Sequence, residues 1–246
     1  MDLNKKQLIS DLNIVIQGEG RYAGVPHLLI RLVGCNLNCK WCDSSYASWK
    51  LEKPKYSLQD LINIVIKNPH IENAFITGGE PTIPMNDELL KGIIDILNDH
   101  DIMIALETNG TIFKELDIDF VTISPKLKNS IPIVGEKLFQ YNIEVTEHHK
   151  KNQENNRINI SSIQKWYDNY DTQFKFVISD KIQIKEVKDM QFELNLSSND
   201  IYLMPEGITN EQLQKKRKFV YELCLKYGYN YSDRLHVLVY DNKRDK

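Results

Sequence analysis

The chain has 246 residues, enough for one α/β domain with a substantial core and short for two independent domains. Its 31 Lys and Arg against 34 Asp and Glu give a net charge of -3, so no general positive field favours nucleic acid as a partner. The amino-terminal residues carry no apolar signal stretch and no later run reaches membrane-spanning length, so we expect a cytoplasmic protein without membrane contact.

Short apolar runs rich in β-branched residues alternate along the chain with longer amphipathic segments. This alternation is typical of βα units around a largely parallel sheet, and it predicts a single α/β domain over residues 1–246 with about six to seven mainly parallel strands. The predicted strands are 27–33, 73–77, 102–107, 119–123, 174–179, 200–204 and 234–240.

Helical periodicity fills the intervals between these strands. The clearest helix starts at Ser57, whose side chain can cap it together with Asp60 three positions further on. A second helix opens at residue 86 or 87. The last long helix covers about 210–227 and places Cys224 on its apolar face, where a lone cysteine usually acts as a small hydrophobic residue.

A polar stretch at about 127–172 interrupts the alternation. It contains His148 and His149, followed by a run of Lys, Asn, Gln and Glu. This composition is too polar for a core, so the stretch is interpreted as a surface insertion with some helix near 161–170 and with solvated histidines.

Five clusters of cysteine, polar, Gly or Pro residues have the same placement in the sequence: each lies at the carboxyl end of a predicted strand. In barrels and open α/β sheets the loops at that end converge on one face. The clusters therefore predict one composite active site. They are Cys35 to Cys42, Thr77 to Pro81, Glu107 to Gly110, Ser124 to Lys126, and Met204 to Gly207.

The first cluster holds three of the four cysteines, which does not fit a disulfide framework. Cys35, Cys39 and Cys42 have the spacing Cys-x3-Cys-x2-Cys, which lets three thiolates wrap one face of a cubic cluster. A 4Fe-4S cluster normally takes four protein thiolates, so three leave one iron open for a ligand. Structural zinc needs a fourth ligand, which His27, Asp43 or a distant histidine would have to provide. A non-catalytic metal-binding module stays open as the alternative.

The aromatic Trp41 before the third cysteine, and Gly-Gly-Glu-Pro after the next strand, make the chain resemble the radical S-adenosylmethionine superfamily. The resemblance implies a partial (βα) barrel of radical SAM type, in which the open iron binds S-adenosylmethionine. Gly78, Gly79 and Glu80 would receive the amine of this cofactor, because glycines let backbone carbonyls approach closely and an acidic side chain suits an ammonium.

Further motifs resemble one family in particular, the 7-carboxy-7-deazaguanine synthases, and the likeness spans nearly the whole chain. Members of that family convert 6-carboxy-5,6,7,8-tetrahydropterin to 7-carboxy-7-deazaguanine with loss of ammonia, a ring contraction that supplies queuosine and related deazapurines. They use Mg²⁺ in addition to the cluster. The motifs are Ile-Gln-Gly-Glu-Gly at 16–20, Arg31, Cys-Asp-Ser at 42–44, Glu-Thr-Asn-Gly at 107–110 and Ser-Pro-Lys at 124–126.

The resemblance implies a role for each matching residue. Arg31 would pair with the pterin carboxylate, since a guanidinium binds carboxylates bidentately. Ser44 would ligate Mg²⁺, a hard cation that prefers oxygen. Glu107 would bind cofactor hydroxyls or only fix the turn that follows it. The substrate would also meet Ile16, Gln17, Gly18 and Thr77, and S-adenosylmethionine would meet Ser124, Pro125, Lys126, Met204, Pro205 and Glu206.

The resemblance also implies a reduced flavodoxin or ferredoxin as electron donor, and a homodimer. Two departures from the family are visible: the insertion at about 127–172 is longer than in many relatives, and the tail after Tyr240 lacks their glycines or terminal proline. His236, in the predicted terminal strand, faces either the site or a satisfied core position. A glycyl-radical-enzyme activating enzyme shares the cluster spacing and remains an alternative.

Overall fold

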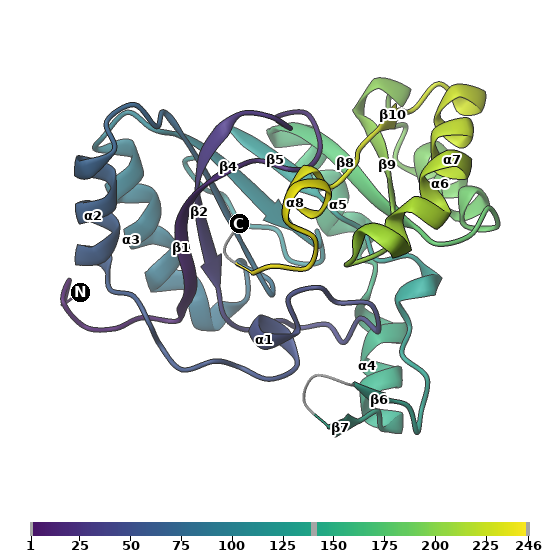
Figure 1. Cartoon of the computed structure of the whole chain (residues 1–246), viewed down its shortest axis with the longest axis horizontal. Coiled ribbons are helices and arrows are strands. Elements are labelled where there is room, and N and C mark those ends of the chain that lie inside the picture. Colours follow the sequence, from purple (N-terminus) through teal and green to yellow (C-terminus); the bar gives the residue numbers. More distant parts are fainter. Residues whose placement is uncertain (1, 139–141, 245–246) are drawn as a thin grey trace.

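A computed structural model describes residues 2–138 and 142–244, which are built around an eight-stranded sheet (Figure 1). Its strand order is β1-β2-β3-β4-β5-β8-β9-β10. The first two strands, β1 (Ile9–Ile16) and β2 (Pro26–Leu32), pair antiparallel, and the remaining pairings are parallel. The other strands are β3 (Asn73–Gly78), β4 (Met103–Thr108), β5 (Phe120–Ile123), β8 (Asp171–Ile178), β9 (Ile201–Pro205) and β10 (Asn230–Tyr231).

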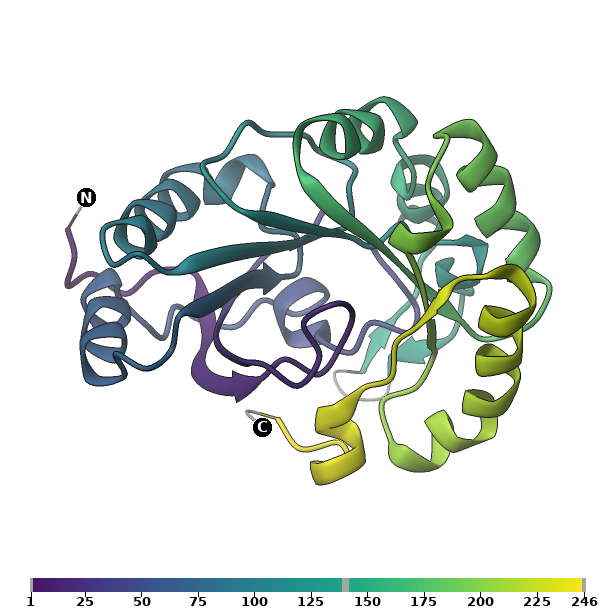
Figure 2. The ribbon, with the colours of Figure 1, turned by 90° about the horizontal axis from the view of Figure 1, so that it is seen from above.

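Helices lie along the outer side of the curved sheet, as Figure 2 shows. The core between these helices and the sheet is fully apolar at its centre, where Trp166, Phe174 and Phe176 are completely buried. No helix among the described residues is both long and apolar enough to cross a bilayer. The helices along the outer side are α2 (Leu58–Lys67), α3 (Asp87–Asn98), α5 (Ile160–Asn169), α6 (Gln183–Glu193) and α7 (Asn210–Tyr227).

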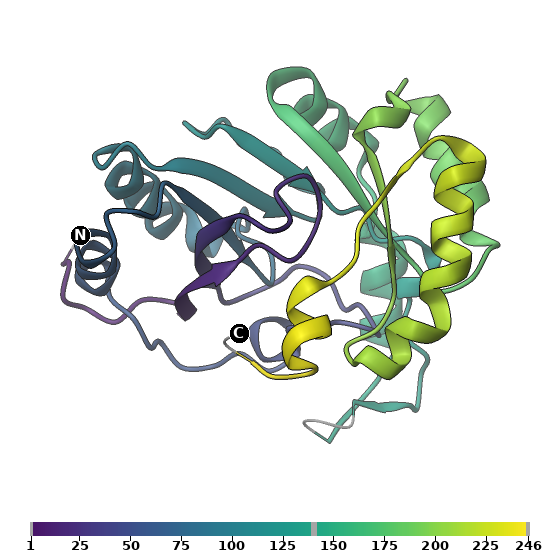
Figure 3. The ribbon, with the colours of Figure 1, turned by 45° about the horizontal axis from the view of Figure 1, so that its top comes forward.

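Short elements complete the fold on the inner side and at the edges. In Figure 3 the yellow helix α8 lies beside the purple loop that joins β1 to β2, and the backbone N–H of Leu235 donates to the carbonyl of Gly18 at 3.0 Å. The short elements are α1 (Ser45–Ser48), η1 (Pro84–Asn86), η2 (Lys128–Ser130), β6 (Lys137–Leu138), β7 (Ile143–Glu144), α4 (Glu147–Asn156), η3 (Ser198–Asp200) and α8 (Leu235–Tyr240).

The predicted α/β class, the mainly parallel sheet and six of the seven predicted strands are confirmed. The helix expected at Ser57 begins there with a complete capping box: Ser57 accepts from the N–H of Asp60, and the Asp60 side chain accepts from the N–H of Ser57. The helices expected near 86, 161–170 and 210–227 are present as α3, α5 and α7. Cys224 is buried in the core as expected.

The predicted strand at 234–240 is wrong, because this segment forms α8. Its apolar, β-branched sequence is typical of a buried strand, but within α8 only Val237 is buried, and Val239 is 70% exposed. The sheet has already ended with β10, and the hydrogen bond from Leu235 to Gly18 takes the chain across the inner side instead.

The interpretation of 127–172 as a stretch too polar for the core is wrong in part. Ile163 and Trp166 of α5 are completely buried in the main core, and Gln153 of α4 is also completely buried. His149 is half-buried with its ring 4.9 Å from that of Trp49, and His148 is exposed. Regular helical spacing places a few buried side chains among many solvated ones, so mean polarity conceals them.

Candidate functional site

A cavity of about 210 Å³ opens at the carboxyl ends of the parallel strands. Loops that follow β2, β3, β4 and β5 reach it, together with side chains near the carboxyl ends of β8 and β9, and the β1–β2 loop and α8 close its other side. The convergence predicted for the strand-end clusters is therefore confirmed in the structure. Of the predicted site residues, Ile16, Gln17, Gly18, Arg31, Cys35, Cys39, Cys42, Ser44, Thr77, Gly78, Gly79, Glu107, Ser124, Lys126 and Met204 line this cavity.

Four predicted site residues lie outside the lining. Glu80 is completely buried, and its carboxylate accepts hydrogen bonds from Thr82 (N and Oγ1), from Thr108 Oγ1 at 2.8 Å and from Asn109 N at 2.6 Å. It joins the loops after β3 and β4 instead of facing the cavity. Glu206 turns away to pair with Lys216 of α7. The other two are Pro125 and Pro205.

The three clustered cysteines are free thiols, and each lines the cavity. Burial raises the pKa of all three, to about 12 for Cys42, and nearby acidic groups add to the rise for Cys35 and Cys42. Three thiols that resist ionisation in one cavity fit a group that supplies positive charge, because thiolates are the metal-binding form. Among the described residues, no three His, Cys, Asp or Glu side chains are close enough to hold a single metal ion.

The Gly-Gly pair after β3 is required by close packing against the cysteine loop. A Cβ on Gly79 would lie 2.1 Å from the carbonyl oxygen of Gly34, and one on Gly78 would lie 2.2 Å from that of Leu32. The N–H of Glu80 donates to the same Gly34 oxygen at 2.7 Å. The two sequence motifs are thus in direct backbone contact, with no space for a methyl group between them.

Arg31 is held by an acidic group at its back. Its Nε lies 2.8 Å from Asp11 Oδ2, and its Nη1 donates to Ser44 Oγ at 3.0 Å. The Asp11 carboxylate also accepts from Tyr46 Oη at 2.9 Å and from Arg244 at 2.6 Å. Burial opposes the charge on Arg31, but Tyr46 and Asp11 favour the charged guanidinium and raise its pKa.

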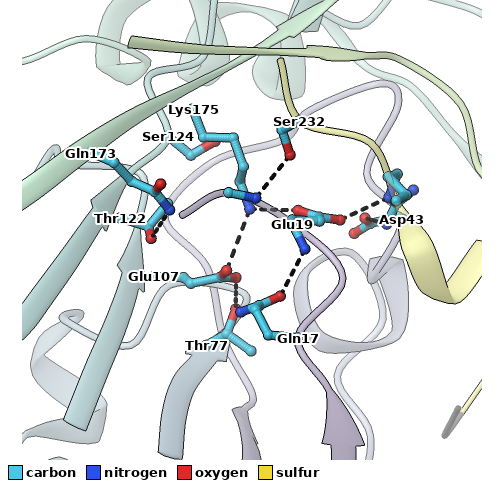
Figure 4. Close-up of polar contacts among 12 residues, drawn as sticks. Gln17, Glu19, Asp43, Thr77, Glu107, Thr122, Ser124, Gln173, Lys175 and Ser232 are labelled. Carbon is cyan, nitrogen blue, oxygen red and sulfur yellow. Dashed lines mark hydrogen bonds and ion pairs between the residues drawn. The ribbon is translucent and has the colours of Figure 1, made fainter. Parts of the chain in front are cut away.

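The cavity wall carries a charged network that was not predicted from the sequence (Figure 4). Lys175 Nζ lies 2.5 Å from Glu19 Oε2 and 3.4 Å from Glu107 Oε1, and Thr77 Oγ1 donates to Glu107 Oε2 at 3.1 Å. Arg234 extends the network by pairing with Glu19 at 2.8 Å and with Asp43.

The network keeps its charges although it is buried. Burial raises the pKa of Glu19, but Lys175 and Arg234 outweigh it and leave that pKa well below its usual range. Burial likewise opposes charge on Lys175, yet Glu107 and Glu19 raise its pKa. The signals that could have found these residues are Glu19 within the Gln-Gly-Glu-Gly motif and a lysine in the middle of the apolar strand β8.

His236, whose orientation the sequence left open, lies on the cavity wall. A Cβ on Gly18 would lie only 2.2 Å from His236 Nδ1, so this part of the β1–β2 loop has no space for a side chain. Burial lowers the pKa of the imidazole, which favours the neutral ring.

Comparisons with known proteins agree with this site. The sequence model of the radical SAM superfamily matches residues 29–127, which contain the three cysteines and the Gly-Gly-Glu-Pro motif. The 7-carboxy-7-deazaguanine synthase of Halobacterium salinarum is 34% identical and covers 95% of this chain and 90% of its own length. The synthase of Rhodopirellula baltica is 31% identical and covers 96% and 88%.

Among solved structures, the crystal structure of QueE from Escherichia coli covers 92% of both chains with a TM-score of 0.59. At 22% identity this likeness concerns the fold, a radical SAM partial barrel with a mostly parallel sheet. Two relatives above 30% identity along nearly the entire sequence, and a superfamily match over the cluster motif, establish that this chain belongs to the 7-carboxy-7-deazaguanine synthases of the radical SAM superfamily.

Proposed function

We propose that this chain is a lyase that converts 6-carboxy-5,6,7,8-tetrahydropterin to 7-carboxy-7-deazaguanine with loss of ammonia, a step in deazapurine biosynthesis. One observation carries the proposal: a single cavity unites three free thiols with Arg31 and with the paired side chains of Lys175, Glu19 and Glu107. Relatives along nearly the whole chain carry the name of this activity.

The cysteine side of the cavity would hold the cofactors. Cys35, Cys39 and Cys42 would bind the 4Fe-4S cluster, which together with S-adenosylmethionine supplies the radical chemistry that removes one hydrogen atom from the substrate. The backbone of Gly79 lies against the cysteine loop, and the side chain of Lys126 lines the same cavity. Predicted contacts to Glu80 are better read as positioning, since that carboxylate is occupied by the adjoining loops.

The part of the cavity wall that carries Arg31, Glu19 and Glu107 would bind the pterin. Arg31 presents a guanidinium whose back is fixed by Asp11, which suits a substrate carboxylate and keeps the donor oriented before the ligand arrives. Glu19 and Glu107 are acceptors for the N–H groups of a pterin ring, and Lys175, which lies against both carboxylates, holds them in place. Holding the ring still against the cofactor is the main contribution that the protein makes to the rate.

Mg²⁺ belongs to the same proposal. Ser44 Oγ lies on the cavity wall 3.0 Å from Asp43 Oδ1, so a hydroxyl and a carboxylate oxygen are available together, which is the donor chemistry that this cation prefers. Bound there, the ion would offset negative charge on the substrate carboxylate. We also propose a reduced flavodoxin or ferredoxin as electron donor and a homodimer, both by the family resemblance, and a single-domain chain, by its length.

The direct test is oxygen-free reconstitution with iron and sulfide, followed by incubation with the carboxypterin, S-adenosylmethionine, Mg²⁺ and dithionite. Mass analysis should detect the deazaguanine acid. Cys39→Ala should lose both this product and cofactor cleavage, whereas Cys224→Ala, which alters a core thiol remote from the cavity, should keep them. Cluster-loaded protein that gives no deazaguanine acid would contradict the proposed activity, as would a Cys39→Ala variant that still turns over.

A further inference from the structure

The polar helix α4 brings a buried amide to one of the clustered cysteines. Gln153 is completely buried, and its Nε2 lies 3.3 Å from Cys39 Sγ and donates to Ser130 Oγ at 2.8 Å. Its Oε1 accepts from the backbone N–H of Asn38 at 2.6 Å. Both ends of the amide are therefore engaged at the cysteine loop, and the distance to sulfur is that of an N–H···S hydrogen bond.

The neighbouring residues of α4 fasten the same loop without touching a sulfur. Asn152 Nδ2 donates to the carbonyl of Asn36 at 2.9 Å and to Asn38 Oδ1 at 2.7 Å. The ring of His149 packs on Trp49, whose Nε1 donates to the carbonyl of Cys39 at 3.0 Å. These contacts fix the position of the cysteine loop against α4, and Gln153 adds the contact to the thiol of Cys39.

The composition of α4 shows why this contact matters for the helix. Its ten residues contain no aliphatic or aromatic hydrophobic side chain, and the buried residue among them is Gln153. Burial of an amide is unfavourable unless its donors and acceptors are satisfied. The position is therefore built around polar partners, and a hydrophobic residue that only filled the space would lose them.

A hydrogen bond to a ligating sulfur stabilises negative charge on it. The 4Fe-4S cluster becomes more negative by one charge when it accepts an electron, with no bond broken and no proton transferred. Such a hydrogen bond therefore favours the reduced form, and hydrogen bonds to the sulfurs are among the features that set the potentials of these clusters.

We propose that Gln153 is a positioning residue for the cluster, whose side-chain N–H to Cys39 Sγ raises the reduction potential and so eases the one-electron reduction that must precede substrate chemistry. The inference rests on the proposed function insofar as it requires the cluster. It gives the stretch at 127–172 a specific role in the site.

The test is a reductive titration of the reconstituted full chain with dithionite and mediators, followed by EPR of the reduced cluster. Gln153→Glu keeps the acceptor for Asn38 but has no N–H for the sulfur, and Gln153→Met keeps the length without either group. In both we expect the reduced-to-oxidised ratio at a fixed potential to fall about tenfold, a shift of about 59 mV to lower potential for a one-electron couple. Asn152→Ala, the matched control, should keep the wild-type potential.

A second measurement needs no substitution. Wild-type protein labelled with ¹⁵N in the glutamine side-chain amides should show a ¹⁵N hyperfine coupling in pulsed EPR of the reduced cluster. Absence of that coupling would overturn the inference, as would variants that hold a full cluster at the wild-type potential. If the variants assemble no cluster, the ¹⁵N coupling in the labelled wild-type protein alone tests the hydrogen bond from Gln153. If wild-type protein itself takes up no cluster, the proposed function fails, which iron analysis detects separately.

Discussion

Replacement of Lys175 by Met should destabilise the protein strongly, because it leaves two largely buried carboxylates without their shared cation. The Lys175 side chain is 7% exposed and serves both Glu19 and Glu107. Loss of one partner of a buried ion pair costs about 3 to 5 kcal/mol. Glu19 keeps Arg234 and Glu107 keeps its hydrogen bond from Thr77, so the lower end of that range, about 3 kcal/mol, is expected.

This loss can be measured by thermal and urea unfolding of the cluster-free chain under reducing conditions. A loss of about 3 kcal/mol corresponds to a fall of about 6 to 12 °C in Tm for a chain of this size. Lys175→Arg should retain most of the stability. Lys218→Met, which removes an exposed lysine of α7, is the matched control and should change it by less than about 0.5 kcal/mol.

The pH dependence gives the reasoning a second test. In the wild type the pKa of Glu19 is below its usual value, so this group contributes stability above pH 4.5, and the contribution is lost as pH falls. Without Lys175, burial favours the protonated form of Glu19. The difference in free energy of unfolding between the wild type and Lys175→Met should therefore shrink as pH falls from 7 towards 5. A deficit that is independent of pH, or no larger than that of Lys218→Met, would refute this view of the network.

Two further predictions concern residues that hold the site from behind. Glu80→Gln should lower the free energy of unfolding in urea by about 1 to 3 kcal/mol and should also lower turnover, because an amide cannot accept all the hydrogen bonds that Thr108 and Asn109 donate to the carboxylate. An unchanged free energy of unfolding would contradict the role described for Glu80. Arg244→Ala should cost about 1 kcal/mol, a value discounted for its partial exposure. Because Arg244 holds the pKa of Glu52 at about 2, the Arg244→Ala deficit should be constant above pH 4.5 and narrow below it, as unfolding followed between pH 3 and 8 will reveal.

The parts of the fold that could be predicted are those in which local pattern and burial agree. β3 is a short apolar run on both faces, as expected of a strand inside a parallel sheet, and α2 combines an apolar stripe with the Ser57 capping box. The convergence of the site also followed from local order, because strand ends in such sheets share one edge.

The parts that could not be predicted depend on partners distant in sequence. β1 was missed because Ile9–Ile16 includes Asp11, whose burial is stabilised by distant partners that include Arg31 and Arg244, the latter 233 residues away. Gln153 lies in a helix that looks fully solvated until the cysteine loop packs against it. Lys175 could be recognised as a buried cation only once Glu19 and Glu107 were known to meet it.

The tight backbone contact of Gly79 with Gly34 bears on any attempt to transplant this metal-binding loop into another protein. The cysteines and the turn after β3 are separated by about forty positions in the sequence. Their backbones nevertheless pack so closely that neither segment can keep its conformation without the other. A graft that carried the cysteine segment alone would need a host backbone with the same bare turn beneath it. The smallest segment that could be grafted therefore contains both β2 and β3, each with the loop that follows it.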